Sequence, residues 1–261
     1  MRPNHTKRKL AEGKVVFGAF CSMLDPAVVE IIGEAGYDFC VIDMEHVPVD
    51  LQLVEHMVRA ADAVDVTPIV RVADDSARSL LRVLETGVQG IMVPHVMSGA
   101  HAAQLVRAIR YPPAGARGIS GTSRAARYGL MDPDRHLRES DSELLLIGML
   151  EDRQAVEDIE AILSTPGLDV AFVAPYDLAG SLGDPFTPMH PVLNEAVEKI
   201  LATSSRVGGA KIGFPSHHRM CPKAVPDLIQ LGVPFIVTAV DYPLLAQAFK
   251  RDVESLAPYR Q

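Results

Sequence analysis

The sequence predicts an α/β protein built as a (β/α)8 barrel, or TIM barrel, and three observations favour this architecture. The chain has 261 residues, close to the roughly 250 that one such barrel needs. Eight short runs rich in β-branched and other apolar residues recur along it, each bounded by Gly, Pro or Asp. Amphipathic stretches separate the runs, as a parallel sheet requires. An open doubly wound sheet has the same local pattern, but the unbroken alternation favours the closed barrel, with residues 1–261 as one domain.

The expected strands are apolar runs, most of them too short to form helices. In chain order they are Val15–Cys21, Tyr37–Asp43, Thr67–Val72, Gly90–Pro94, Leu144–Leu150, Asp169–Ala174, Gly209–Phe214 and Pro234–Ala239. The expected helices carry apolar residues at helical spacing. They are Asp25–Ala35, Leu51–Ala63, Ser76–Glu85, Ser98–Arg110, Gln154–Leu163, Pro191–Arg206, Ala224–Leu231 and Pro243–Leu256.

One segment, Tyr111–Glu143, interrupts the alternation between the fourth unit and the fifth strand. It is rich in Pro, Gly, Arg and Ser. Loops of this length inside a compact domain are usually functional or interfacial. Its Arg117, Arg124 and Arg127 would either recognise an acidic substrate or pair across subunits.

Composition excludes several kinds of partner. Hydrophobic residues make up 48% of the chain, which is enough to bury a large core. The net charge of -8 disfavours nucleic acid, and the one basic run, Lys7–Lys9, is interpreted as a solvated, frayed N-terminal segment. No apolar stretch reaches the 18 residues of a membrane span, and no signal peptide opens the chain. The three cysteines have neither metal-site spacing nor a disulfide pattern. We expect a cytoplasmic protein that binds neither nucleic acid nor membrane.

The active site of a barrel forms at the carboxyl ends of its strands, so the residues that follow each apolar run carry the functional prediction. These positions are polar. The second run ends in Asp43, Glu45 and His46, the third in Arg71, the fifth in Glu151 and Asp152, and the sixth in Tyr176 and Asp177.

Glu151 and Asp177 follow adjacent strands, which lie about 4.8 Å apart, so both carboxylates can reach one point above the barrel. Two carboxylates that leave the other positions to water and substrate suit Mg²⁺ or Mn²⁺, with Co²⁺ as a further candidate. The alternative is that these acids, or Asp152, only cap the helices that follow them.

His46 and Arg71 are the candidate base and the candidate oxyanion partner. A neutral imidazole beside acids suits a general base, although His46 could simply begin the next loop. A guanidinium at a barrel mouth suits a carboxylate substrate or a developing oxyanion. The alternative for Arg71 is a surface ion pair with Asp74 or Asp75.

Two further features point to chemistry less strongly. Lys211 lies in a strand and could form a Schiff base, but no recognisable partner accompanies it. His217 and His218 are adjacent, so their side chains diverge and joint metal ligation is disfavoured.

Taken in order, the motifs of the chain resemble those of the HpcH/HpaI aldolase family. They are Tyr37–His46, Pro68–Arg71, Gly87–Pro94, Arg110–Gly118, Arg124–Gly129, Glu151, and Ala174–Leu178 followed by Ser181–Gly183. The resemblance runs from about Gly18 to Tyr242. It implies a barrel whose last helix is swapped between protomers of a homohexamer, a trimer of dimers. It also implies catalysis by a divalent metal rather than by a lysine.

The resemblance further implies roles for individual residues. Glu151 and Asp177 would hold the metal, and His46 would be the base. Arg71 would stabilise an enolate. Glu85 stands where the family often has Asp, and it would raise the basicity of His46.

Other residues would support this site. Asp43 and Glu45 would belong to the same network. The backbone around Tyr176 and Asp177, at the start of a short helix, would receive the substrate carboxylate, as helix N-termini favour anions.

The chain departs from the family pattern at two positions. Met149 replaces a common Gln in the substrate pocket, and Ala174 replaces a common Gly. Because Met cannot donate the hydrogen bonds of an amide, the first change bears on which donor substrate is preferred.

The expected reaction is reversible aldol cleavage of a 4-hydroxy-2-oxo acid to pyruvate or hydroxypyruvate and an aldehyde. Two alternatives stay open. The same enolate would serve an oxaloacetate decarboxylase or a malyl-CoA or citryl-CoA lyase, or the barrel could be a catalytically silent binding or assembly module.

Overall fold

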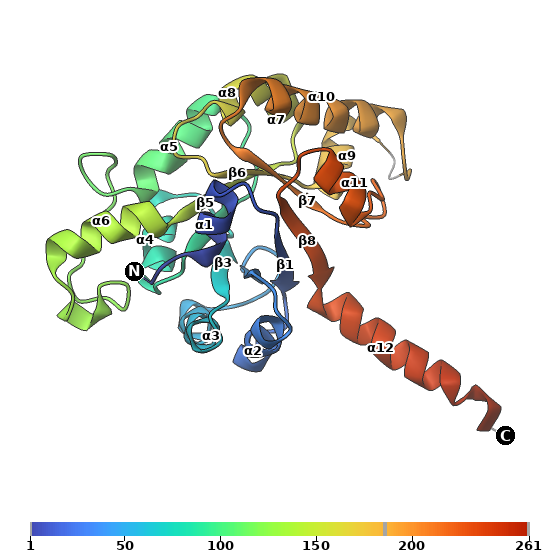
Figure 1. The fold of residues 1–261 in the computed structure, drawn as a ribbon, viewed down its shortest axis with the longest axis horizontal. Coiled ribbons are helices and arrows are strands. Elements are labelled where there is room, and N and C mark those ends of the chain that lie inside the picture. Colours follow the sequence, from blue (N-terminus) through green and yellow to red (C-terminus); the bar gives the residue numbers. More distant parts are fainter. Residues whose placement is uncertain (1, 185–186, 260–261) are drawn as a thin grey trace.

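Eight strands pair in parallel, each with its neighbours in sequence, and the last returns to the first to close a barrel in the computed structural model (Figure 1). The structure describes residues 2–184 and 187–259. The strands are β1 Val16–Cys21, β2 Phe39–Asp43, β3 Thr67–Arg71, β4 Gly90–Val93, β5 Leu145–Leu150, β6 Val170–Val173, β7 Lys211–Pro215 and β8 Phe235–Val240. The predicted closed barrel and all eight predicted strands are confirmed.

Helices follow the strands, and all of them but the last form the outer ring. They are α2 Pro26–Glu34, α3 Leu51–Ala63, α4 Ala77–Glu85, α5 Gly99–Ile109, α7 Arg153–Glu157, α8 Ile159–Leu163, α9 Pro175–Leu182, α10 Pro191–Val207, α11 Val225–Gln230 and α12 Asp241–Ser255. Side-chain oxygens of Asp25, Asp50, Ser76 and Ser98 accept amide N–H groups in the first turns of α2 to α5, which fixes where these helices begin. The one helix predicted between β5 and β6 is divided into α7 and α8.

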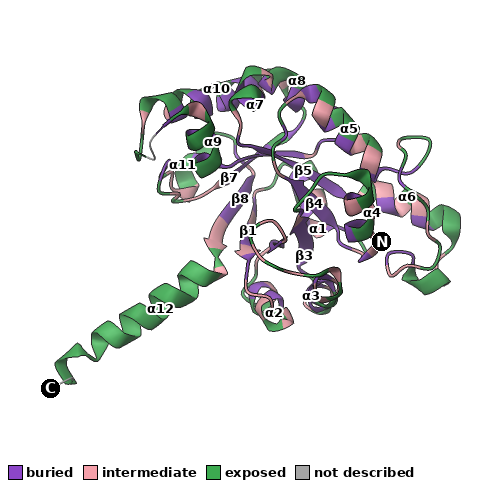
Figure 2. Cartoon of the chain, turned by 180° about the vertical axis from the view of Figure 1, so that it is seen from behind, coloured by how far each residue is buried: buried purple, intermediate pink, exposed green. Residues whose placement is uncertain are grey.

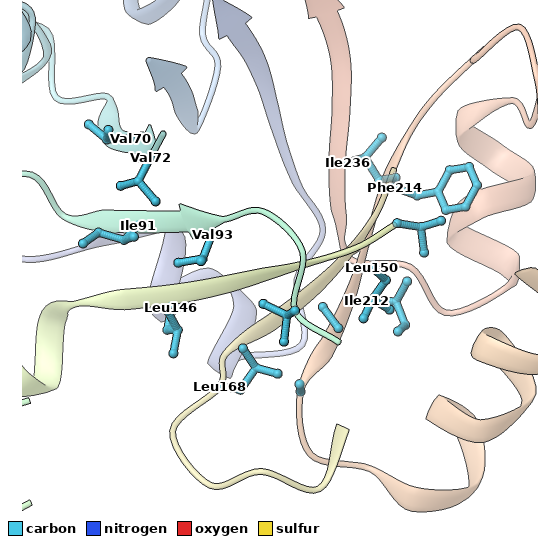
Figure 3. Packing of buried hydrophobic residues seen from close by; sticks show 14 of the residues in the cluster. Val70, Val72, Ile91, Val93, Leu146, Leu150, Leu168, Ile212, Phe214 and Ile236 are labelled. Atoms are coloured by element: carbon cyan, nitrogen blue, oxygen red, sulfur yellow. The ribbon is translucent and has the colours of Figure 1, made fainter. Parts of the chain in front are cut away.

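Alternate residues of the strands fill two separate layers. Inward-facing side chains fill the lumen with a cluster that includes Phe39, Val41, Ile69, Ile147, Met149, Phe172 and Phe235. Outward-facing side chains pack against the helices, and Figure 3 shows part of this outer layer, from Val70 and Val72 to Phe214 and Ile236. The lumen is tightly filled, because a Cβ on Gly18 of β1 would lie 2.1 Å from the Phe39 ring. The barrel is therefore a packed core that can support groups only at its ends.

The N-terminal segment corrects the sequence prediction. Residues 7–9 are part of helix α1, His5–Ala11, which closes the amino end of the barrel and is not a frayed tail. Thr6 is fully buried and donates to the carbonyl of Asp38 at 2.9 Å, and Leu10 joins the lumen cluster. Lys7 Nζ lies 3.2 Å from the Asp169 carboxylate. The basic side chains of residues 7–9 suggested a solvated segment, but they belong to a helix that buries Thr6 and Leu10.

The interrupting segment also contains structure that the sequence did not predict. A short 3-10 helix η1, Arg127–Gly129, precedes helix α6, Pro133–Glu143. Within α6, the buried His136 ring lies between two partners, with Nε2 3.2 Å from the Tyr111 hydroxyl and Nδ1 3.2 Å from the Ser140 hydroxyl. These contacts hold α6 against the start of the segment.

Helix α12 projects away from the barrel (Figure 1), and Figure 2 shows it exposed along its length. Its exposed side chains include several large apolar ones, namely Tyr242, Leu244, Leu245, Phe249 and Val253, with Leu256 just beyond its end. None of its residues is buried in this chain. Among the described residues, no helix has the length and apolar character needed to cross a membrane.

Candidate active site

The polar residues singled out from the sequence continue the inward-facing series of their strands. Asp43 follows Phe39 and Val41 at alternate positions of β2, and Arg71 follows Ile69 on β3. Glu151 extends the same alternation just beyond β5. Because side chains alternate along a strand, these three are aimed at the carboxyl mouth of the barrel.

Asp43 and Arg71 form the most ordered part of the site. They are paired residues in the β2–β3 register, and Arg71 donates from Nε at 3.0 Å and from Nη2 at 2.8 Å to the two carboxylate oxygens of Asp43. The Arg71 guanidinium also lies 4.7 Å from the centre of the Phe20 ring. Burial disfavours the charged form of Asp43, but the Arg71 hydrogen bonds and charge hold the pKa of Asp43 below its ordinary value. This bidentate pairing fixes the plane of the guanidinium.

The surface-pair interpretation of Arg71 is wrong. Asp74 accepts the amide N–H of Ser76 at 2.7 Å, and Asp75 pairs with His101 at 2.8 Å. Both aspartates are engaged locally, while Arg71 turns into the mouth.

The turn after β2 brings Glu45 and His46 to the same place. Asp43 Oδ1 accepts the amide N–H groups of Glu45 at 3.0 Å and of His46 at 3.3 Å. Glu45 Oε2 lies 3.3 Å from Arg71 Nε and 3.6 Å from His46 Nε2. The His46 side chain is 62% exposed, so it sits at the rim, where it can exchange a proton with a bound molecule or with water.

Glu151 is the buried acid of the site, with only 2% of its side chain exposed. Its Oε1 accepts the amide N–H of His95 at 2.6 Å. Burial raises the pKa of Glu151 to about 7, the carboxylates of Asp177 and Glu45 act in the same direction, and the His95 contacts oppose them. The carboxyl groups of Glu151, Asp177 and Glu45 are therefore close enough to interact, and that of Glu151 is shielded from water.

The capping interpretation is wrong for Asp152, whereas Asp177 is not an N-cap but does lie in the first turn of a helix, where an acid is favourable. Asp152 occupies the N-cap position of α7, but its side chain makes no capping bond there and instead lies 3.0 Å from the His95 ring. The N-cap of α9 is Ala174, whose side chain has no oxygen, and Asp177 lies in the first turn of that helix.

The carboxylates fit a divalent cation. The Glu151 carboxylate is buried, which makes its negative charge costly, and the exposed Asp177 adds charge of the same sign. Glu45 Oε2 is a buried oxygen without a hydrogen-bond partner among the described residues, and it is paired with Arg71 at 3.3 Å. A cation would neutralise this charge. Over residues 2–184 and 187–259 there is no group of three or more His, Cys, Asp or Glu side chains arranged for a metal. A two-carboxylate site would thus leave the remaining positions to water and substrate, as Mg²⁺ usually does.

Glu85 is not brought to His46 within one chain. It is the last residue of α4, which runs back from the mouth toward the amino end of the barrel. There its Oε1 accepts a hydrogen bond from the buried Arg117 guanidinium at 3.2 Å. The predicted pairing with His46 fails in the single chain because a helix of this length separates the two residues.

Arg117 and Arg124 likewise lie away from the mouth of their own chain. Arg117 is stacked 4.4 Å from the centre of the Tyr111 ring, and Arg124 donates to the Thr86 carbonyl at 2.8 Å and pairs with Asp62. Neither reaches a substrate bound in the same barrel.

Lys211 is at the wrong end for a Schiff base. It is the first residue of β7, exposed, at the amino end of the barrel. This position agrees with the prediction from sequence that catalysis does not use a lysine.

The other predicted substrate residues surround the site to different extents. Met149 is 2% exposed in the lumen layer directly below Glu151, so it forms a floor. Tyr176 is 41% exposed, and its ring meets the His218 ring edge-on at 4.4 Å between centres. Asp177 acts electrostatically on His218 as well as on Glu151, so His218 also lies near the predicted metal site.

Two side chains of the site were missed by the sequence analysis. Phe20, whose ring lies beside Arg71, is an ordinary strand residue by sequence. His95 follows the Pro94 that ends the fourth run, and only its position after a strand could have drawn attention to it. Partial burial opposes a charged ring, but the Asp152 hydrogen bond and the Glu151 charge raise the pKa of His95 above its ordinary value.

A (β/α)8 barrel that gathers buried acids, an arginine and histidines at its carboxyl end has the arrangement of an enzyme active site. Residues 17–226 match the family model described as HpcH/HpaI aldolase/citrate lyase. The pyruvate aldolase of Rhizobium etli is 36% identical over 94% of each chain. The 2-keto-3-deoxy-L-rhamnonate aldolase of Klebsiella pneumoniae is 32% identical over 95% of this chain and 91% of that enzyme.

A solved structure of a family protein from Burkholderia cenocepacia superposes with a TM-score of 0.89 at 30% identity, covering 97% of this chain and 99% of the other. The chain belongs to the HpcH/HpaI aldolase/citrate lyase family, and it is a carbon–carbon lyase.

Proposed function

We propose that this enzyme is a divalent-metal-dependent class II aldolase that cleaves a 4-hydroxy-2-oxo acid to pyruvate, or hydroxypyruvate, and an aldehyde. The observation that carries the proposal is the buried Glu151 carboxyl with those of Asp177 and Glu45 close enough to raise its pKa, and Glu45 is in turn paired with Arg71 at 3.3 Å. The aldolase names of its relatives support the reaction class, and the pyruvate aldolase among them supports the donor.

Glu151 and Asp177 would hold the cation, Mg²⁺ or Mn²⁺ with Co²⁺ as a further candidate. When bound, such an ion supplies a Lewis acid for the carboxylate and carbonyl oxygens of a 2-oxo acid, which acidifies the C3 protons. The N-terminal turn of α9, around Tyr176 and Asp177, is the predicted seat of the substrate carboxylate.

Arg71 and His46 perform the protein's share of the chemistry. Asp43 and Glu45 hold Nε and Nη2 of Arg71, so Nη1 is the donor we assign to the oxygen that becomes negative in the enolate. His46, at the rim, accepts the proton from the C4 hydroxyl during cleavage and returns one during condensation, directly or through water.

Pyruvate C3 proton exchange in heavy water tests the proposal. The chelator-treated enzyme should exchange these protons only after Mg²⁺, Mn²⁺ or Co²⁺ is added, and treatment with borohydride and pyruvate should leave Lys211 unmodified. Exchange that persists in chelator would overturn the metal requirement.

The same preparation separates the alternative reactions. Succinic semialdehyde, tartronate semialdehyde, lactaldehyde and glyceraldehyde would be offered with pyruvate and with hydroxypyruvate. Oxaloacetate and malyl-CoA or citryl-CoA would be offered alone. Faster turnover of oxaloacetate or of a thioester than of any aldol pair would replace the aldolase assignment, and no turnover of any kind would favour a silent barrel.

We also propose that the enzyme is a homohexamer, a trimer of dimers, in which α12 packs on a second copy of the chain. The apolar side chains that α12 exposes support this assembly. Together with its unburied length, they favour a helix whose partner surface belongs to another protomer.

A further inference from the structure

His95 has a left-handed backbone. It follows β4 and Pro94, and its φ of 55° lies in a region that few residues other than glycine adopt, although histidine, asparagine and aspartate adopt it more often than most. Such a conformation persists only where surrounding contacts hold it.

This backbone places the amide and the ring of His95 beside one oxygen of Glu151. The amide N–H donates to Oε1 at 2.6 Å. The ring Nδ1 bonds to Asp152 Oδ2 at 3.0 Å, which fixes the ring with Nδ1 3.4 Å from the same Oε1 as an ion-pair contact. Since the amide and the ring both lie against Oε1, Oε2 is the oxygen left to face the predicted cation.

We propose that His95 is a positioning residue that orients the Glu151 carboxylate for metal binding through its left-handed backbone and its Asp152-held ring. The inference rests on the proposed function, because it assumes that Glu151 is a metal ligand. His95 acts through Glu151 and is itself neither a ligand nor the proton carrier. Residues that orient metal ligands in this way commonly change metal affinity when replaced.

Three substitutions separate the backbone contribution from the ring contribution. His95→Asn keeps a residue that tolerates positive φ and offers an amide donor near the position of Nδ1. His95→Gly keeps the backbone but removes the ring. His95→Val introduces a β-branched residue that resists positive φ and so displaces the amide N–H.

The readout is the Kd for Mn²⁺, measured by titration calorimetry on the metal-free enzyme without substrate. We expect His95→Asn to bind close to wild type, and His95→Gly and His95→Val to bind about 10- to 100-fold more weakly, with Val the weaker. His101→Ala is the matched control, because it removes another histidine–aspartate pair, at 2.8 Å from Asp75, outside the acid cluster. It should leave the Kd unchanged.

Equal Mn²⁺ affinity in wild type, His95→Gly and His95→Val would overturn the inference, and so would a loss in His95→Asn as large as that in His95→Val. Thermal unfolding of each metal-free variant reports whether it folds, and if the Val variant does not, the Gly and Asn variants decide. A wild-type enzyme that binds no Mn²⁺ defeats the proposed function itself. A wild type that binds Mn²⁺ beside variants that bind it equally well defeats only the role of His95.

Discussion

At the scale of single residues, Arg71 is the side chain whose surroundings define its role most closely. Asp43 holds it bidentately, Phe20 lies against it, and only 12% of its side chain is exposed. A guanidinium fixed before substrate arrives needs no reorganisation as charge develops.

Arg71→Ala should therefore lower kcat by about 10²–10³-fold, the usual cost of one oxyanion donor. Arg71→Lys keeps the charge but loses the bidentate pairing, and should recover only part of the rate. Steady-state kinetics with saturating Mn²⁺ would test this. A change in KM alone, with kcat intact, would mean that Arg71 binds ground-state substrate and transition state equally.

The acidity of Glu151 differs between the folded and the unfolded chain. Its pKa is raised on folding to about 7, so above pH 7 the folded metal-free protein carries a charge that burial disfavours. This cost is absent below the ordinary pKa of a glutamate and grows as the pH rises to about 7.

Glu151→Gln should accordingly make the metal-free protein more stable at pH 8, by up to about 3 kcal/mol, and leave it little changed at pH 4.5. The same variant should lose the stabilisation that Mn²⁺ gives the wild type. Chemical unfolding at the two pH values, with and without Mn²⁺, measures both effects. Mn²⁺ stabilisation that survives in the variant would remove Glu151 from the ligands.

Much of the site was predictable from sequence because barrel chemistry follows directly after strands. Asp43 and Arg71 are the last residues of β2 and β3, and Glu151 directly follows β5, so all three stand at the ends of recognisable apolar runs. His95 stands in an equivalent place but was missed, because its backbone conformation and its Asp152 contact are tertiary properties. The pairing of Glu85 with His46 was implied by the family resemblance alone. The position of Glu85 at the far end of a helix from the barrel mouth did not enter that prediction.

At the scale of elements, α6 depends on a histidine that must stay neutral. Burial lowers the pKa of His136, and its ring nitrogens lie between the hydroxyls of Tyr111 and Ser140. The contribution of this group to stability is fully present above the ordinary pKa of a histidine. It is lost as the pH falls toward the lowered pKa, because the unfolded chain gains a proton that the folded chain excludes.

His136→Gln keeps hydrogen-bonding groups but cannot titrate. Wild type should lose stability relative to this variant between pH 7.5 and pH 5.5, by at most about 1.4 kcal/mol per pH unit. Urea unfolding at both pH values compares them. Parallel pH profiles would show that the ring is not the titrating group.

The elements also explain which parts of the fold sequence patterns can reveal. Strands buried on both faces need apolar residues at nearly every position, so all eight were recognised. Helix α6 has only His136 and Ser140 buried, and α1 has only Thr6 and Leu10. Helices that bury so few and such polar residues leave almost no periodic pattern, and both were missed.

At the scale of the whole molecule, α12 is the element whose apolar side chains stay exposed within one chain. If the proposed hexamer depends on α12, ending the chain after Val240 should leave the barrel folded but yield species smaller than a hexamer. Light scattering after size-exclusion chromatography measures the mass, and far-ultraviolet circular dichroism checks the fold.

Phe249→Glu, at a side chain that is 63% exposed in the single chain, should weaken assembly in the full-length protein. A hexamer that survives both changes would place the subunit contacts elsewhere.

The closure of the amino end by α1 ties together parts of the sequence that are far apart. Thr6 bonds to Asp38 and Thr67 in the first third of the chain, and Lys7 contacts Leu144 and Asp169 beyond its middle. One short helix thus bridges the ends of strands on two sides of the barrel, so that its removal would loosen both sides together.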